Sequence, residues 1–442
     1  MVTQAELEHL LELGHELRHL EVKAPGGLDD NLLVARVARA VMAMGNLRDG
    51  GLVCVGIDDG QIAAMQPGLT AAQLADWTDF DRVSAALGKY SDPPIFFETH
   101  TFALSSGADV VVLEVEEFER DVHVCKKSFQ GVLVDGHTYV RPRGQPRSVL
   151  PPTSADMREL HDLAVDKGVR EFVRRAGAAG VPLNATTPPT AATGEADRSA
   201  FEAEWELAWA APSVVNAPAP QAAAIPTPAY FDVAVRPGPY QAERLTPAQL
   251  DPFVVEHAVR LRGWPVPMVS PSDHLQRHGT WLAQDSQSIF HIEAWRLFTS
   301  GQFVQRRVLA TDVRDADELR AEDPRATGAV ALWDVLLYVV EVVELGARMA
   351  TRLGCETVTF EVSLRGIAGR ELISGDRRRH LYGPYLSAAD SFSAARTLDV
   401  PDLLTDPRTI GVEVAQRILR QFGIDVPDQV LHDYQENVLE RG

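Results

Sequence analysis

Three acidic residues and one lysine near the start of the chain have the types and spacing of a metal site that acts on phosphodiesters. Glu16, Glu21 and Lys23 fall within HELRHLEVK at 15–23, and Asp59 lies in GIDDG after an apolar run. Carboxylate oxygens are the ligands that hard divalent cations such as Mg²⁺ and Mn²⁺ prefer. Such an ion polarises a phosphodiester and activates water, and a nearby lysine offsets the charge that builds on the phosphate. We therefore predict catalytic residues Glu16, Glu21, Lys23 and Asp59, with the three acids as metal ligands.

A short strand and the loop after a second strand must position these side chains. Residues 17–24 alternate between apolar and polar types, which predicts a strand with the second glutamate and the lysine on one face. LVCVGI at 52–57 is a continuous apolar run, typical of a central buried strand. Asp59 follows that run in a loop, where functional residues often lie. Glu16 has the opposite parity, so it joins the group only if the chain bends before the strand.

A structural interpretation of the same residues stays open. Glu21 and Lys23 can form a solvated ion pair, and Asp58-Asp59-Gly60 can be an ordinary turn. From the residues alone this interpretation is the simpler one. The choice between Asp58 and Asp59 as the ligand is also open.

The rest of the chain predicts an α+β protein with two domains and a linker. A length of 442 residues is too long for one ordinary domain. We place the domains at 1–175 and 227–442, separated by an Ala-, Pro- and Thr-rich linker at 176–226 with a short helix at 198–209. In the first domain we expect helices at 4–14, 30–44, 71–89 and from 154, strands at 95–103 and 109–116, and a hairpin through 131–144. In the second we expect strands at 230–235, 288–298, 302–310 and 356–364, and helices at 246–262, 329–353, 410–422 and 427–439.

Composition limits the partners and the location of the protein. A net charge of −20 argues against a protein that coats nucleic acid through its overall field. Three cysteines far apart fit a reducing cytoplasm, and no apolar run is long enough to predict a membrane span. His123 and Cys125 are half of a zinc-site pattern, but no second cysteine pair completes it. Nucleic acid must therefore bind through a local basic patch.

The candidates for such a patch lie in the second half of the first domain. Arg141 and Arg143 alternate along one predicted strand, which suits contacts with phosphate groups. The competing interpretation is ordinary surface charge. The predicted substrate-binding residues are Lys126, Lys127, Arg141, Arg143 and Arg147, to which Arg174 and Arg175 can be added.

Several of these motifs occur in the order found in one family. E-x4-E-x-K, a helix ending near Gly-Asn, GG-x4-GIDD-G, and TYVRPRG before a helix together resemble the Schlafen-type AlbA-like domain over residues 12–165. The resemblance implies an N-terminal AlbA-like α/β domain with a three-carboxylate site that cuts tRNA or rRNA with a divalent metal. Matched by motif, that site falls on Glu16, Glu21 and Asp59, with Lys23 beside them. The family's zinc site is matched only at His123 and Cys125.

We therefore expect a cytoplasmic, Mg²⁺- or Mn²⁺-dependent endoribonuclease of prokaryotic Schlafen type that cleaves tRNA or other structured RNA in stress or phage defence. One N-terminal domain offers a single carboxylate cluster, so we expect a homodimer in which two N-terminal domains share one groove. The main alternative is a non-catalytic regulator that uses the same domain to bind DNA or RNA, and a third is a nucleotide sensor. The second domain names no chemistry, and a sensor, regulatory or oligomerisation role is expected only from its position.

Overall fold

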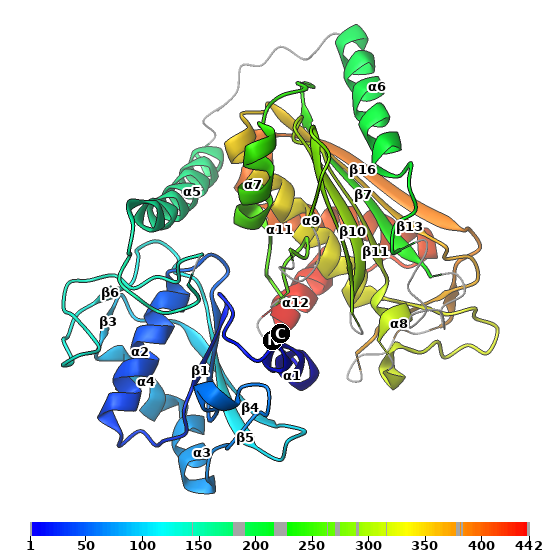
Figure 1. The fold of residues 1–442 in the computed structure, drawn as a ribbon. Helices are drawn as coiled ribbons and strands as arrows, with labels where there is room; N and C mark the ends of the chain where they lie inside the picture. The colour runs from blue at the N-terminus through cyan, green and yellow to red at the C-terminus, as the bar shows by residue number, and fades with distance from the viewer. Residues whose placement is uncertain are drawn as a thin grey trace. The chain divides into compact units, whose positions relative to one another are not determined.

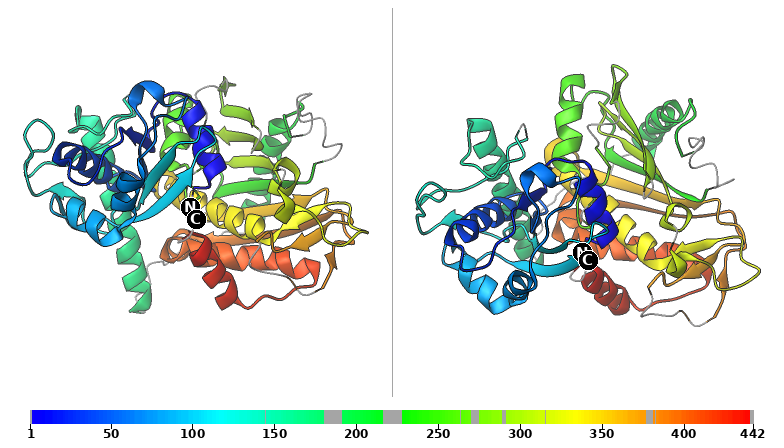
Figure 2. Two further views of the ribbon diagram at one scale, coloured as in Figure 1. Left: turned by 90° about the horizontal axis from the view of Figure 1, so that it is seen from below. Right: turned by 60° about the horizontal axis from the view of Figure 1, so that its bottom comes forward.

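The computed structural model describes residues 2–143, 145–179, 191–215, 228–262, 264–269, 275–288, 291–314, 316–376, 381 and 383–439. The chain forms two compact units, Met1–Glu171 and Phe172–Arg441, and the boundary falls inside helix α5 (Ser154–Ala178). Both units combine helices with β-sheet, so the predicted α+β class is confirmed (Figures 1 and 2).

The N-terminal unit is built on a four-stranded sheet with helices on both faces. Its strands, in spatial order, are β1 (Leu20–Lys23), β2 (Gly51–Val55), β5 (Asp109–Val115) and β4 (Phe97–Ala103). Strand β1 runs parallel to β2, and the other neighbours are antiparallel. Apolar residues of α2 (Asn31–Gly45) form one core with Val53 and Val55, and those of α1 (Gln4–Glu12) form another with Val22 and Cys54.

Local capping decides where the helices of this unit begin. Helix α2 starts as predicted, because the Asp30 carboxylate accepts hydrogen bonds from the Leu32 and Leu33 amides at 2.9 and 3.0 Å. The single helix predicted over 71–89 is wrong. It is divided into α3 (Ala71–Thr78) and α4 (Phe80–Gly88), because Asp79 is extended and its carboxylate caps α4.

The hairpin predicted through 131–144 is also wrong as a regular element. In its described residues this region forms isolated bridges, such as Val124 with Thr138 and Val140 with Val149, and no regular strand. The two-residue strand β6 (Val124–Cys125) precedes it and pairs with β3 (Ser91–Asp92). Pro142 and Pro146 cannot donate to a β-ladder, which accounts for the irregular backbone around them.

The C-terminal unit contains a seven-stranded antiparallel sheet. Its strands in spatial order are β16 (Ser391–Asp399), β13 (Thr357–Arg365), β7 (Tyr230–Gly238), β11 (Phe303–Val308), β10 (Ile292–Phe298), β9 (Trp281–Gln287) and β8 (Gln276–Arg277). A second sheet is formed by β12 (Ala329–Ala331), β14 (Glu371–Ile373) and β15 (Tyr385–Leu386). Strands β9 and β16 were not predicted, and the helix predicted over 329–353 begins three residues later because its start forms β12.

Helix α9 (Leu332–Leu353) is the centre of this unit's core. Gly346 lets it approach the sheet, because a Cβ there would lie 2.4 Å from the Phe360 ring. Gly411 of α11 (Pro407–Leu419) lets that helix approach α9, because a Cβ there would lie 2.7 Å from the Val340 Cα. The remaining helices are α6 (Ala191–Ala208), α7 (Leu250–His257), α8 (Ala310–Val313), α10 (Val400–Thr405) and α12 (Asp428–Leu439), with short 3₁₀ turns at Asp59–Gln61, Pro247–Gln249, Asp317–Leu319 and Arg420–Phe422. None of the helices within the described ranges has both the length and the apolar character that a membrane crossing needs.

Candidate functional site

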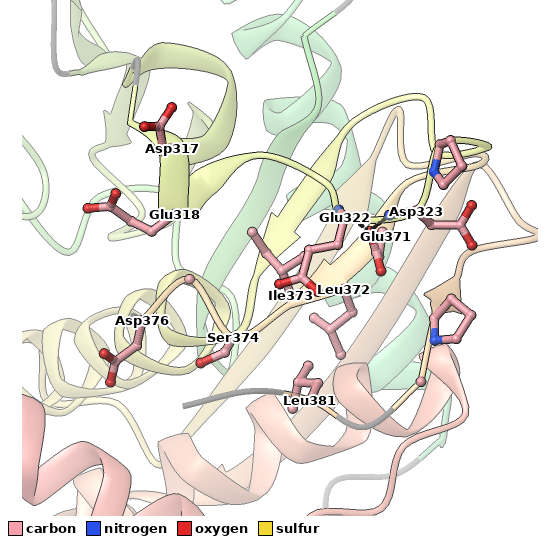
Figure 3. A pocket seen from close by; sticks show the side chains of 14 residues that line it. Asp317, Glu318, Glu322, Asp323, Glu371, Leu372, Ile373, Ser374, Asp376 and Leu381 are labelled. Atoms are coloured by element: carbon pink, nitrogen blue, oxygen red, sulfur yellow. Dashed lines mark hydrogen bonds between the residues drawn. The ribbon is translucent and has the colours of Figure 1, made fainter. Parts of the chain in front are cut away.

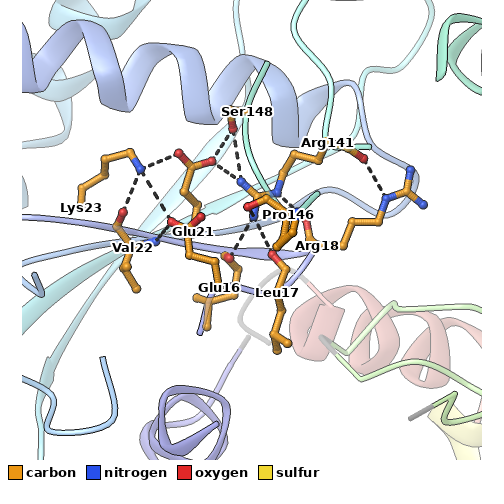
Figure 4. Close-up of polar contacts among 10 residues, drawn as sticks. Glu16, Leu17, Arg18, Glu21, Val22, Lys23, Arg141, Pro146 and Ser148 are labelled. Atoms are coloured by element: carbon orange, nitrogen blue, oxygen red, sulfur yellow. Dashed lines mark hydrogen bonds and ion pairs between the residues drawn. The ribbon is translucent and has the colours of Figure 1, made fainter. Parts of the chain in front are cut away.

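Three of the four predicted catalytic residues, Glu16, Glu21 and Lys23, lie at the outer edge of β1, the first strand of the N-terminal sheet (Figure 4). The Leu52 amide of β2 donates to the His19 carbonyl, and the Gly56 amide just after β2 donates to the Lys23 carbonyl, so the backbone groups of Leu20 and Val22 point away from the sheet. An edge strand with free backbone groups is a template for unwanted pairing. The contacts made at this edge therefore decide whether the predicted catalytic side chains are free to act or are used to protect the strand.

Charged side chains and one tight turn occupy the outward backbone groups of β1. Glu16 Oε1 accepts from the Val22 amide at 3.0 Å, and Lys23 Nζ donates to the Val22 carbonyl at 2.8 Å. Leu20 exchanges backbone hydrogen bonds with Leu17, at 3.1 and 3.2 Å. The polar side chains at this edge are called the β1 edge cluster: Glu16, Glu21, Lys23, Arg141 and Ser148.

Glu21 is the buried centre of the β1 edge cluster. Its carboxylate pairs with Lys23 Nζ at 2.5 Å and also accepts from Arg141 Nη1 and Ser148 Oγ. Burial alone would raise the pKa of Glu21, but the positive charges of Lys23 and Arg141 outweigh it and hold the pKa below 4.5. Glu21 is therefore a charged, fully partnered side chain.

Arg141 is buried, although it was predicted to contact phosphate at the surface. Only 1% of the residue is exposed, and besides Glu21 its guanidinium donates to the carbonyls of Arg18, Leu17, Leu20 and Pro146, at 2.6 to 3.1 Å. These contacts tie the loop before α5 to β1 and direct the guanidinium away from the surface, so a phosphate contact at Arg141 stays a prediction that this burial does not favour. Its Glu21 partner is 120 residues away in sequence, so no local pattern could have revealed the pair.

Glu16 and Lys23 are the accessible members of the cluster. Their side chains are 20% and 13% exposed, and Lys23 Nζ lies 3.9 Å from Glu16 Oε1. Burial and the neighbouring charge of Glu21 raise the pKa of Glu16, and Lys23 opposes the rise. Such a carboxylate is better suited to taking up and releasing a proton than an ordinary surface glutamate.

The structure does not assemble the predicted three-carboxylate metal site. Asp59 is exposed at the first position of a 3₁₀ turn, and the half-buried Asp58 precedes it. The Ile57 amide donates to the Lys23 carbonyl at 3.1 Å, so this loop begins beside the end of β1. Within the described ranges no group of three His, Cys, Asp or Glu side chains could hold a metal ion. Because Glu21 is already paired with two cations, the donor set does not fit Mg²⁺ or Mn²⁺, and the use of such an ion stays a prediction.

The other predicted substrate-binding residues are at the surface but differ in their contacts. Arg143 forms an ion pair with Glu159 of α5, with Nε and Oε2 3.3 Å apart. Lys126, Lys127 and Arg147 are exposed, the first two directly after β6. Arg174 and Arg175 are exposed on α5. Besides Arg143, which pairs with Glu159, the predicted cations Lys126, Lys127 and Arg147 are therefore exposed on the N-terminal unit.

Two contributions to this site were missed in the sequence. The Ser148 hydroxyl bonds Glu21 across 127 residues. Arg18 donates to Glu159 at 2.8 Å and so fastens α5 to the turn before β1. A lone serine and a surface-type ion pair leave no signal in a single sequence.

The C-terminal unit contains an acidic pocket of about 790 Å³ (Figure 3). The carboxylate of Glu371 is buried and accepts from the amides of Glu322 and Asp323, at 2.7 and 2.8 Å. Other acidic residues in the lining are Asp317, Glu318 and Asp376. Within the described ranges these acidic side chains do not form a group that could coordinate a metal ion, and acidic residues alone do not identify a ligand.

Comparison with known proteins gives little information about this fold or site. No family model matches the chain, and no curated protein matches it. Among solved structures, the DIP2311 protein from Corynebacterium diphtheriae is similar at 16% identity, with a TM-score of 0.22. That match covers 30% of this chain and 22% of the other, and it is too weak to support an argument about structure or function.

Proposed function

We propose that the N-terminal unit binds RNA or DNA through exposed cations and does not cut it. The observation that carries this proposal is the state of Glu21, whose carboxylate is occupied by Lys23, Arg141 and Ser148 at a closed strand edge. A carboxylate in that position stabilises the fold, and its two buried cations compete with any metal ion for its oxygens. This leaves the binding role of the domain that the motifs resemble.

Lys126, Lys127 and Arg147 are the residues proposed to contact the nucleic acid. All three are exposed, and in a chain with a net charge of −20 they supply local positive charge. Contacts with phosphate groups release counterions, so affinity must fall as salt rises. The protein should therefore bind nucleic acid only through a few such contacts and with a shallow salt dependence.

Fluorescence anisotropy with labelled tRNA and with a labelled DNA duplex, at several salt concentrations, tests this proposal. The double variant Lys126→Ala/Lys127→Ala should bind several-fold more weakly and lower the salt slope by roughly one per lost phosphate contact. Arg82→Ala is the matched control, because Arg82 is an exposed cation elsewhere on the same unit and pairs with Asp76. Absence of binding at low salt, or an equal loss in the control, would contradict the proposal.

A second candidate is RNA cleavage without a metal, and the setting of Glu16 favours it. The Glu16 carboxylate would take the proton of a ribose 2′-hydroxyl, whose oxygen attacks the adjacent phosphorus and expels the 5′-oxygen. The proton returns to that departing oxygen, which gives a 2′,3′-cyclic phosphate and a 5′-hydroxyl end, while Lys23 offsets the charge on the phosphate.

Incubation of the purified protein with total tRNA separates the candidates. No cleavage with Mg²⁺, Mn²⁺ or EDTA supports the binding role. Cleavage of RNA in EDTA that is lost in Glu16→Gln, together with no cleavage of a DNA substrate that lacks the 2′-hydroxyl, would establish the second candidate instead. Cleavage that requires Mn²⁺ or Mg²⁺ would restore the metal site expected from the resemblance.

A further inference from the structure

Strand β4 is the other edge of the N-terminal sheet, and its outward backbone groups are open except at its end, where the Ala103 carbonyl accepts from Gln4 Nε2 at 2.7 Å. The Glu116 amide donates to the Phe96 carbonyl at 3.0 Å, and the Leu104 amide to the Ala108 carbonyl at 2.9 Å. Even-numbered residues of this segment therefore bond β5, and odd-numbered residues point their amides and carbonyls outward. Within the described ranges, the outward groups of Phe97, Thr99 and Thr101 make no hydrogen bond.

Other sheet edges within the described ranges carry protecting contacts or are short, and β4 differs from them. The β1 edge cluster closes β1. Along β16, Gln421 Nε2 donates to the Ser393 carbonyl at 3.0 Å, and Arg417 Nη1 donates to the Ala395 carbonyl at 3.3 Å. Strand β8 is only two residues long. Proteins usually protect edges in such ways, so a long open edge indicates a surface used for pairing.

Exposed aromatic side chains lie at the beginning of β4. Phe96 is 59% exposed and Phe80 is 52% exposed, and the Phe80 ring lies 5.6 Å from the ring of Phe97. Isolated exposed apolar residues are common on protein surfaces. Two of them beside an open strand edge give the edge an apolar contact that a partner can bury.

We propose that β4 pairs antiparallel with β4 of a second copy of this chain, about a two-fold axis at Thr99. This inference does not depend on the proposed nucleic-acid function. Odd-numbered residues form the hydrogen-bonded pairs, so Thr99 faces its own symmetry mate and Phe97 faces Thr101 of the partner subunit. The result is one continuous sheet across the dimer, with each interface surface identical to the other.

The side chains of β4 are complementary to themselves in this register. Glu98 faces His100 of the partner subunit, and His100 faces the partner's Glu98, so a carboxylate meets an imidazole on both sides of the axis. Within one chain, His100 Nε2 already lies 3.6 Å from Glu98 and 3.2 Å from Glu114, so the imidazole is directed towards carboxylates. Phe96 faces Phe102 of the partner subunit, and this contact covers the exposed ring of Phe96. The Thr99 hydroxyl, which has no hydrogen-bond partner within the described residues, meets a second threonine hydroxyl. A one-residue shift of the register would lose all of these pairs.

Sedimentation velocity and light scattering on the full chain test the proposal. The interface is small, so we expect a mass rising from 48.4 kDa towards twice that value between about 1 and 100 µM protein. Hydrogen exchange at the Phe97, Thr99 and Thr101 amides should slow over the same concentration range. A wild-type protein that stays monomeric at the highest concentration would overturn the proposal.

Two variants and one control locate the interface. Thr99→Pro removes only an outward amide, which an edge strand tolerates, and should give a monomer that unfolds at nearly the wild-type temperature. Phe96→Ser should weaken the dimer by at least tenfold. Phe172→Ser is the matched control, because Phe172 is 64% exposed on α5, outside β4. A dimer that persists in both variants, or is weakened equally by the control, would show that another surface pairs.

Discussion

Replacement of Arg141 by methionine is the sharpest test of the view that the β1 edge cluster is structural. The change removes the guanidinium that holds Glu21, Ser148 and several carbonyls, and it leaves the Glu21 carboxylate buried with Lys23 as its remaining cation. Removing one partner of a buried ion pair costs about 3–5 kcal/mol, because the remaining charge stays out of water. We therefore expect the N-terminal sheet to open far more often in this variant.

Hydrogen exchange of the β2 amides measures that opening in the full-length protein, without assuming that both units unfold together. A loss of about 3–5 kcal/mol corresponds to exchange that is roughly a hundred to several thousand times faster for amides that exchange through opening. The β13 amides of the C-terminal unit should be unaffected. They therefore serve as an internal reference.

Arg143→Met is the matched control for this experiment. Arg143 lies two residues along the chain but is 34% exposed and pairs with Glu159 at the surface, so its loss should cost less than about 1 kcal/mol. The double variant Glu21→Leu/Arg141→Met removes both buried charges and should recover most of the loss. Equal exchange rates in Arg141→Met and Arg143→Met would refute the reasoning.

Three further predictions follow from single features. Burial raises the pKa of Glu21 and its cations lower it further, so that the pKa in the folded protein is below the usual value of 4.5. The contribution of Glu21 to the free energy of unfolding is therefore present above about pH 4.5 and is lost as the pH falls through the folded-state pKa. In urea titrations at several pH values, Glu21→Gln should remove this part of the loss of stability at low pH. Gly346→Ala should lower the stability of the C-terminal unit by about 1–3 kcal/mol, because its Cβ would lie 2.4 Å from Phe360, whereas Gly168→Ala on α5 meets nothing within 4 Å and should stabilise the protein by about 0.5–1 kcal/mol in thermal unfolding. The Cys54 thiol is buried, which raises its pKa to about 12, so it should react with a thiol reagent only after unfolding; rapid labelling of the native protein at this residue would contradict its placement.

Periodicity predicted the elements whose burial follows from their own sequence. The apolar runs of β2 and α9 and the alternation in β1 predicted the correct type of element, because each pattern reports one local geometry. The division of 71–89 at Asp79 was missed, since a continuous helix and a capped pair have almost the same apolar spacing.

The candidate site was only partly predictable for a different reason. Glu21 and Lys23 share a face as expected, but the role of Glu21 is set by Arg141 and Ser148, which come from an irregular segment far along the chain. An arginine that alternates along a presumed strand looks like a surface cation. Only the tertiary structure shows that it is buried.

The closed edge of β1 also changes what the motif Glu-x4-Glu-x-Lys can be used to infer. A chain that replaced Glu16 or Lys23 would expose the Val22 amide or carbonyl and offer a site for aggregation. Selection for solubility would therefore keep these residues in a protein that had no catalytic activity. Their presence in a sequence is evidence for this strand edge, and evidence for cleavage must come from measured activity.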